Sequence, residues 1–174
     1  DATETNLLIG TSEGLIILNL STTEKKVYTG NSTNLKSFTN NYITQIFQDS
    51  RGLIWVGTRE GLNILNLETD ELDCLTEKQG LCNNNICGIA EDKNHCIWVT
   101  TSRGVSRIVI QRNHEEGVNN YGLYNYTTAD GLQSNEFNMG SILTKQDGEV
   151  LLGGLYGVNW VLHRDGAEKE ELPR

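Results

Sequence analysis

The residues best suited to catalysis are few and lie apart in the sequence. None of the three histidines stands beside a serine or cysteine nucleophile motif, and none is spaced from another as metal ligands are: His95, His114 and His163. His95 occupies a turn position and His114 a polar stretch. We therefore expect histidines at turns and on the surface, and we predict no catalytic residue, no metal site and no cofactor.

Two pairs of neighbouring carboxylates could in principle act as acid and base on a glycosidic bond. These pairs are Asp70 with Glu71 and Glu115 with Glu116, and both fall in stretches predicted to be outer loops. Solvated surface carboxylates explain them better. An enzyme would instead gather His, Glu or Tyr on innermost strands, and residues 42–48 and 86–91 offer few of these.

Four cysteines, Cys74, Cys82, Cys87 and Cys96, fall within one stretch of the chain. Their spacing does not match a CxxC zinc pattern. Cys87 aligns with Thr44 and Cys96 with Leu53 of a sister repeat, so both replace ordinary strand residues. Free structural thiols are the favoured interpretation, and at least one disulfide is the alternative in an oxidising compartment.

An internal repeat organises the chain and places these residues. Four segments share an apolar run, a pair of small residues, two variable residues, and then Gly followed by an apolar residue. They cover residues 7–15, 54–62, 97–105 and 150–158. The last glycine of each is Gly14, Gly61, Gly104 and Gly157, so the intervals are 47, 43 and 53 residues. These glycines are expected to supply a positive φ or a close approach at a turn.

A complete repeat is expected to contain four short strands. In the second repeat we expect strands at residues 42–48, 53–58, 61–67 and 71–76, with a turn at 49–52 and no stretch of helical periodicity. A repeat of this length with four strands is typical of a propeller blade. The sequence therefore predicts an all-β partial β-propeller of about three and a half four-stranded blades.

The predicted organisation is a single partial propeller. It consists of an incomplete blade at 1–39, blades at 40–82 and 83–133, a closing blade at 134–166 and a tail at 167–174. The first unit lacks its innermost strand. A complete ring has about four to eight blades, and we expect seven. An open ring exposes apolar faces between blades, so these faces should be covered by remaining blades or by a second copy of the chain.

Tryptophan positions fit the core of such blades. Trp55 and Trp98 align with Leu8 and Leu151 of the sister units, and Trp160 aligns with Ile64. All three tryptophans are therefore predicted to pack between blades, although sugars also stack on aromatic faces.

The sequence from Asn40 to Thr58, followed by Glu60-Gly61-Leu62, closely resembles the two-component regulator propeller repeat. The likeness continues through Gly80-Leu81 and residues 83–86 to Ile97-Trp98-Val99. Residues 126–159 resemble the closing blade of the second propeller in such sensors. The third unit departs from the pattern at His95 and Thr100, and it carries an insertion from Arg112 to Asn120.

The resemblance implies a part of the periplasmic sensor region of a hybrid two-component histidine kinase and response regulator of the Bacteroidetes type. It also implies that glycan-derived oligosaccharides are sensed and that the kinase and membrane span lie in other parts of the parent protein. The alternatives are a carbohydrate-active lyase or hydrolase built on a propeller, and a purely structural dimerisation module.

One face of the ring is the predicted ligand-binding face. The turn between the second and third strands of a blade and the connection between blades lie on the same side of a propeller. Variable residues on a rigid frame suit binding, and Asn, Arg and Glu suit sugar hydroxyls. The candidates for a small carbohydrate ligand are Asn40, Asn41, Arg59, Glu60, Asn83, Asn84, Arg103, Asn135 and Tyr156. The competing interpretation is that the asparagines simply terminate turns.

Net charge and hydropathy limit the other partners. The formal net charge of −9 disfavours binding to nucleic acid. No apolar run approaches the ~20 residues of a membrane helix, so contact with a membrane is expected only through other parts of the parent protein.

Overall fold

The structure is a computed structural model that describes residues 6–30, 37–112 and 119–161. Fourteen strands and two short 3-10 helices are formed there. The strands are β1 (Asn6–Gly10), β2 (Leu15–Asn19), β3 (Lys25–Tyr28), β4 (Ile43–Gln48), β5 (Ile54–Thr58), β6 (Leu62–Asn66), β7 (Glu71–Leu75), β8 (Ile86–Glu91), β9 (Ile97–Thr101), β10 (Gly104–Arg112), β11 (Asn119–Tyr126), β12 (Phe137–Thr144), β13 (Val150–Gly154) and β14 (Gly157–Val161). The helices are η1 (Glu77–Gln79) and η2 (Thr128–Asp130). No helix among these residues is long and apolar enough to cross a membrane.

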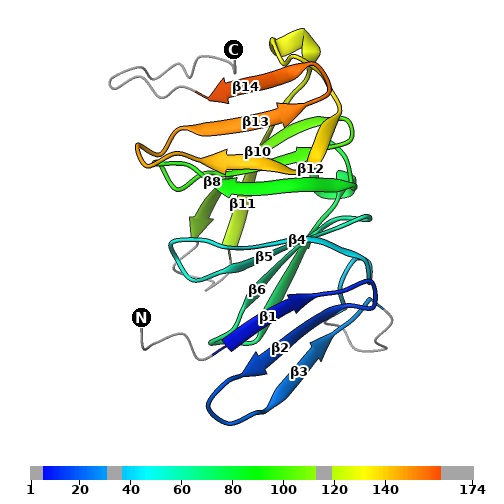
Figure 1. Ribbon diagram of the computed structural model, residues 1–174, viewed down its shortest axis with the longest axis vertical. Coiled ribbons are helices and arrows are strands. Elements are labelled where there is room, and N and C mark those ends of the chain that lie inside the picture. The colour runs from blue at the N-terminus through cyan, green and yellow to red at the C-terminus, as the bar shows by residue number, and fades with distance from the viewer. Residues whose placement is uncertain (1–5, 31–36, 113–118, 162–174) are drawn as a thin grey trace.

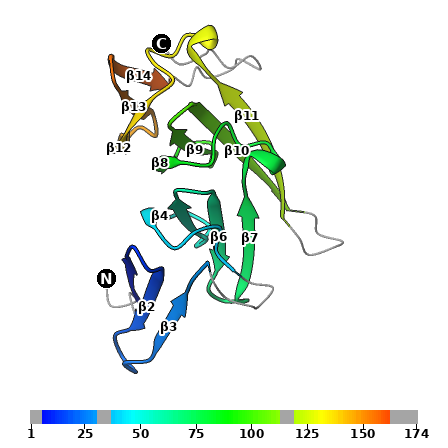
Figure 2. The ribbon, with the colours of Figure 1, turned by 90° about the vertical axis from the view of Figure 1, so that its right-hand side faces the viewer.

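The strands form four antiparallel sheets, which we call blades 1 to 4 (Figure 1). Blade 1 has the order β1-β2-β3, blade 2 β4-β5-β6-β7, blade 3 β8-β9-β10-β11 and blade 4 β12-β13-β14. Figure 2 shows the blades following one another along an arc, with β4, β8 and β12 on its inner side. The predicted all-β partial propeller is thus confirmed, and among the described residues blade 1 has three strands. The seven-bladed complete ring stays a prediction.

The core lies between blades, because alternate residues of a strand point to opposite faces of its sheet. In β5, Ile54 and Val56 pack in the cluster shared with blade 1, whereas Trp55 packs in the cluster shared with blade 3. In β9 the same alternation sends Trp98 into the cluster shared with blade 4. Trp55 and Trp98 are buried, as predicted.

Neighbouring blades approach closely where one of them has a glycine. A Cβ built on Gly10 would lie 2.8 Å from Ile43 Cγ2, and one built on Gly57 would lie 2.7 Å from Ile86 Cγ2. Blade 3 has Thr100 in place of this glycine. There Gly88, the strand partner of Thr100, leaves room for the isoleucine of blade 4, with Ile142 Cγ2 2.8 Å from its ideal Cβ. The departure at Thr100 therefore shifts the contact to the adjacent strand without removing it.

A buried aspartate closes the first turn of blades 2 and 3. Asp49 accepts hydrogen bonds from the Trp55 indole (2.9 Å) and from the backbone N–H groups of Arg51 and Leu53 (both 2.9 Å). Asp92 does the same for Trp98 at 2.7 Å. Blade 4 has Lys145 and Leu151 at the equivalent positions, so the acceptor and the indole donor change together.

Both end blades expose apolar residues on the face that has no neighbour within the described chain. We call these the end faces. Blade 1 exposes Leu7, Ile9 and Val27, and blade 4 exposes Leu143, Val158 and Trp160. The prediction that Trp160 lies in the core is wrong, since 43% of its surface is exposed. It aligns with Ile64, which packs on the following blade, and the described residues hold no blade after blade 4.

Several sequence-based expectations concern backbone and thiols. The four repeat glycines have φ between 123° and 143°, as predicted. All four cysteines are free, so the favoured interpretation holds and no disulfide forms among them. The insertion near Arg112 lengthens the hairpin of β10 and β11. Its residues 113–118, together with His114, the Glu115 and Glu116 pair, His163 and the tail at 167–174, lie outside the described residues.

Candidate functional site

The turns between the second and third strands hold variable residues on a fixed frame. In blade 2, Thr58 Oγ1 donates to the Gly61 carbonyl (2.8 Å) and accepts from the Glu60 N–H (3.1 Å). Thr11 and Thr101 make the same pair of bonds in blades 1 and 3. Arg59 and Glu60 are therefore exposed on a rigid turn, as is Arg103 of blade 3.

Each connection into blades 3 and 4 is built on a short capped turn. Thr76 and Gln79 form a capping box around η1, and Gly80 ends it in the left-handed conformation. Thr127, Asp130 and Gly131 repeat this arrangement around η2. The Asn84 side-chain oxygen accepts from the Glu77 N–H (2.7 Å), and that of Asn135 accepts from the Thr128 N–H (2.7 Å).

The other candidate asparagines also stabilise turns. The side-chain oxygens of Asn40, Asn41 and Asn83 accept from the N–H groups of Tyr42 (2.8 Å), Gly30 (2.6 Å) and Asn85 (3.1 Å), respectively. All five predicted asparagines therefore lie in the connections between blades. The side-chain oxygen of each accepts a hydrogen bond from a backbone N–H group in these connections. This favours the turn-terminating interpretation for the oxygens, while a role of these residues in ligand binding stays a prediction.

In blades 2, 3 and 4, a buried polar residue that was not predicted from the sequence attaches the preceding connection to the third strand of the blade. Asn63 accepts from the Thr39 N–H, Ser106 from the Cys82 N–H and Asn159 from the Gln133 N–H, at 2.8 to 2.9 Å. They recur 43 and 53 residues apart, in phase with the repeat glycines. The signal available in the sequence was a polar residue that recurs in phase with the repeat glycines inside an otherwise apolar strand.

The predicted ligand-binding face does present some side chains to solvent. The Arg59 guanidinium lies 3.8 Å from the centre of the Tyr42 ring, which joins a turn of blade 2 to the connection before it. In blade 4, the Tyr156 N–H donates to Gln133 Oε1 (2.7 Å), and 81% of the Tyr156 surface is exposed. Arg59 and Tyr156 are therefore the candidates best placed to reach a ligand.

The geometry around His95 argues against nucleophilic catalysis there. Ser50 Oγ and Glu91 Oε1 both approach His95 Nδ1, at 2.9 and 3.2 Å, and Ser50 Oγ also bonds Glu91 directly at 2.6 Å. A catalytic imidazole must lie between hydroxyl and carboxylate, with one ring nitrogen for each. Here one nitrogen serves both, so the cluster joins the turns of blades 2 and 3.

The predicted acidic pair does not face a common point either. Asp70 accepts from the Tyr28 hydroxyl (2.7 Å), whereas Glu71 accepts from Thr69 Oγ1 (2.9 Å). Burial and the neighbouring Asp70 raise the pKa of Tyr28 above its ordinary value. Within the described part of the chain, no group of three or more His, Cys, Asp or Glu is placed to hold a metal ion.

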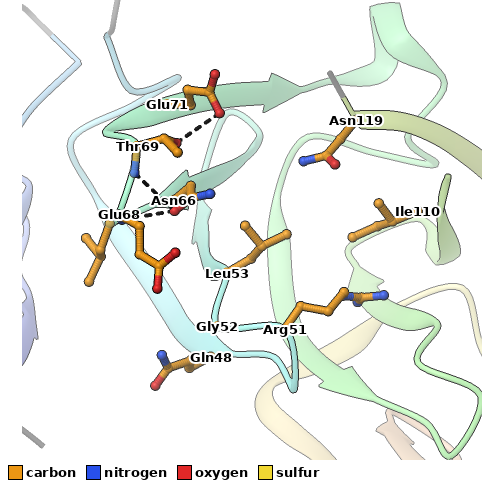
Figure 3. Close-up of a pocket in the computed structure, with 11 residues that line it drawn as sticks. Gln48, Arg51, Gly52, Leu53, Asn66, Glu68, Thr69, Glu71, Ile110 and Asn119 are labelled. Atoms are coloured by element: carbon orange, nitrogen blue, oxygen red, sulfur yellow. Dashed lines mark hydrogen bonds between the residues drawn. The ribbon is translucent and has the colours of Figure 1, made fainter. Parts of the chain in front are cut away.

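A groove of about 500 Å³ lies between blades 2 and 3 (Figure 3). It is on the face of the arc opposite the predicted ligand-binding face. The first and third turns of blade 2 and the long hairpin of blade 3 form it. Its lining combines charged and amide side chains with aliphatic ones: Gln48, Arg51, Gly52, Leu53, Asn66, Leu67, Glu68, Thr69, Glu71, Ile110 and Asn119. We call it the inter-blade groove. None of its residues belongs to the predicted ligand-binding face.

The charged groups at the inter-blade groove interact with residues around it. Arg51 lies 2.9 Å from Asp49 and 3.7 Å from Glu91, and it donates to the His95 carbonyl (3.0 Å). Beside the groove, the Tyr121 hydroxyl donates to Asp73 (2.6 Å), and burial together with this carboxylate raises the pKa of Tyr121. The positive charge of Arg51 is thus balanced by Asp49 and Glu91, while Glu68 and Glu71 lie at the rim of the groove.

This fold places the chain in the β-propeller class. Residues 37–60 and 80–103 match the two component regulator propeller family, and these segments span the connections and first two strands of blades 2 and 3. The resemblance recognised in the sequence is therefore confirmed over these two segments. No curated protein matches the chain.

Solved structures share the arrangement of blades at low sequence identity. The extracellular domain assigned to the hybrid two component system BT3049 of B. thetaiotaomicron is 20% identical with a TM-score of 0.58, over 99% of this chain and 31% of that one. The corresponding domain of BT4673 from the same organism gives 18% and 0.51, over 94% and 26%. PorZ, a surface component of the type-IX secretion system of Porphyromonas gingivalis, gives 14% and 0.68, over 100% and 26%. The chain thus spans less than a third of these structures, and they share its fold.

Proposed function

We propose that the chain is a non-catalytic, ligand-binding propeller segment of the periplasmic sensor region of a hybrid two-component histidine kinase. The observation that carries this proposal is the family match in two successive blades, which supports a sensor over other propellers. The ligand is a glycan-derived oligosaccharide, and its binding changes how blades pack. The kinase that reads this change belongs to another part of the parent protein.

The end faces support the view that the segment works inside a larger assembly. Apolar side chains such as Val158 and Trp160 are exposed on blade 4, and Leu7 and Val27 on blade 1. Exposed apolar surface of this kind marks an interface. We propose that further blades of the parent protein cover these faces, with a second copy of the chain as the alternative occupant.

The local geometry favours binding over catalysis. Between blades 2 and 3, Ser50 and Glu91 both approach the same ring nitrogen of His95. The carboxylates of Asp70 and Glu71 accept hydrogen bonds from different donors. An enzyme would need a nucleophile or an acid and base that face a common point. The rigid turns that carry Arg59 and Tyr156 instead suit recognition.

PorZ provides the main rival, because its TM-score is the highest of the three structures described above. A fold shared at 14% identity carries no activity with it. The repeat match in blades 2 and 3 favours the sensor, and a segment of a surface-exposed secretion component is the alternative.

Binding and turnover should be measured together on one set of oligosaccharides. Calorimetric titration of the chain with maltotriose, cellotriose, mannotriose and trigalacturonate should give saturable binding of at least one, and chromatography should recover that sugar intact. Cleavage of any sugar would refute the non-catalytic role. Absence of binding to neutral and acidic sugars alike would remove the saccharide ligand from the proposal.

A further inference from the structure

The inter-blade groove has the chemistry of a saccharide site, although it lies away from the predicted ligand-binding face. We propose that it binds a short neutral saccharide and discriminates against acidic ones. This inference rests on the proposed function as a saccharide sensor, and it names a site and a ligand class for it. The groove's volume of about 500 Å³ falls in the usual range of small-molecule sites.

Amide groups supply the hydrogen bonds that sugar hydroxyls need. Gln48 at the end of β4, Asn66 at the end of β6 and Asn119 at the start of β11 surround the groove (Figure 3). An amide can donate and accept at once, which matches two neighbouring hydroxyls of a pyranose. The Asn66 oxygen already accepts from the Glu68 N–H (2.9 Å), so its NH₂ group is the one to offer a ligand.

The aliphatic part of the lining suits the C–H faces of a sugar ring. Leu53 is buried and Ile110 is half-buried, and both line the groove between blades 2 and 3. Such a surface gains free energy when it loses contact with water. The groove therefore pairs an apolar surface with a polar rim, as an amphiphilic ring requires.

Charge sets the ligand class. The groove contains one arginine, Arg51, and two rim carboxylates, Glu68 and Glu71. Arg51 is already paired with the buried Asp49 at 2.9 Å, so an incoming carboxylate or sulfate would meet uncompensated negative charge. Each like-charge contact at close range weakens binding about fivefold even in a watery environment. A neutral sugar escapes this repulsion.

Two blades contribute to the site, which connects binding with signalling. Residues from Gln48 to Leu53 and from Asn66 to Glu71 belong to blade 2, whereas Ile110 and Asn119 belong to blade 3. A ligand bonded to both blades would stabilise their relative position. The site is therefore placed to change how two neighbouring blades pack against each other.

Adjacent strand residues offer a matched pair of variants. Asn119 lines the groove, while Asn120 follows it in β11, is exposed, and points to the other face of the sheet. N119A should weaken binding of the neutral trisaccharides maltotriose, cellotriose or mannotriose about three- to tenfold, the worth of one hydrogen bond. N120A should leave it unchanged. The charge-reversing variant E68K should strengthen trigalacturonate binding at least fivefold.

Calorimetric titration of the wild-type chain and these variants decides the proposal, and R59A probes the predicted ligand-binding face separately. Neutral binding that falls in N119A but not in N120A supports the groove. Neutral binding that falls only in R59A overturns the groove and leaves the sensor function standing. Wild-type preference for trigalacturonate overturns the ligand class, and absence of binding to every sugar overturns the groove and the saccharide sensor together. Circular dichroism spectra establish that each variant is folded.

Discussion

The contact between Gly57 and Ile86 offers a sharp test of how the blades fit together. Gly57 lies in β5 of blade 2 without a positive φ, so alanine meets no backbone strain there. The new Cβ would lie 2.7 Å from Ile86 Cγ2 and 3.0 Å from Thr44 Oγ1, against ordinary contacts of 3.4 to 4 Å. The two blades would have to separate by about 0.7 Å, the difference between 3.4 and 2.7 Å.

The magnitude follows from two opposing effects. Overpacking a tight core costs about 1–3 kcal/mol, and Ile86 is fully buried and cannot turn away. Replacing glycine by alanine recovers about 0.4–1 kcal/mol by restricting the unfolded chain. The net loss expected for G57A is therefore about 1–2 kcal/mol, which lowers Tm by roughly 2–8 °C in a domain of this size.

Urea denaturation followed by tryptophan fluorescence measures this loss, and G122A provides the control. Gly122 lies in β11 and also lacks a positive φ, but the nearest atom to its ideal Cβ is 3.7 Å away. G122A should be neutral or slightly stabilising. In an I86A background the cost of G57A should shrink by at least about 0.5 kcal/mol, because the obstructing methyl is absent. Equal costs in both backgrounds, or a neutral G57A, would refute the close approach of the blades.

Three further predictions concern the turns, the thiols and the end faces. D49A should lower the free energy of unfolding by about 2–4 kcal/mol, because it leaves the Trp55 indole and the Leu53 N–H buried without an acceptor. Urea denaturation measures this loss, and a loss below about 0.5 kcal/mol would contradict the prediction. Burial raises the pKa of Cys74, Cys82, Cys87 and Cys96, so the folded chain should hold fewer thiolates at pH 8 than the urea-unfolded chain. Ellman's reagent should therefore react more slowly with the folded chain, and its rate should rise as the pH increases. Equal rates for the folded and unfolded chains would be evidence against burial. V158D should reduce self-association in analytical ultracentrifugation at unchanged stability, whereas V161D, at a buried position of the same strand, should unfold the chain; a V158D chain that unfolds would contradict the exposed end face.

Much of the fold is readable from the sequence because the repeat carries its own alignment. Continuous apolar runs such as Leu53 to Val56, which are buried on both faces, and the positive-φ glycines at Gly61 and Gly104 are local features, and several copies agree in phase. Trp160 was misplaced because alignment with Ile64 assumes a following blade. Burial depends on a neighbour that the local sequence does not encode.

The candidate site was harder to predict for a related reason. The asparagines from Asn40 to Asn135 were correctly located in the connections, but the use of their oxygens depends on backbone N–H groups up to eleven residues away. The inter-blade groove was missed altogether. Gln48 and Asn119 are far apart in the sequence, and only the packing of blade 3 on blade 2 brings them together.

Every functional inference depends on the four sheets being successive wedges of one ring. Isoleucine-methyl-labelled NMR tests this arrangement directly, through nuclear Overhauser contacts from the Cγ2 methyl groups of Ile43, Ile86 and Ile142 to the Hα protons of Gly10, Gly57 and Gly88, respectively. Three strong cross-peaks, one for each boundary between blades, are expected. Their absence, or contacts that join blade 1 to blade 3 or blade 4 instead, would contradict the propeller arrangement and with it the sensor assignment.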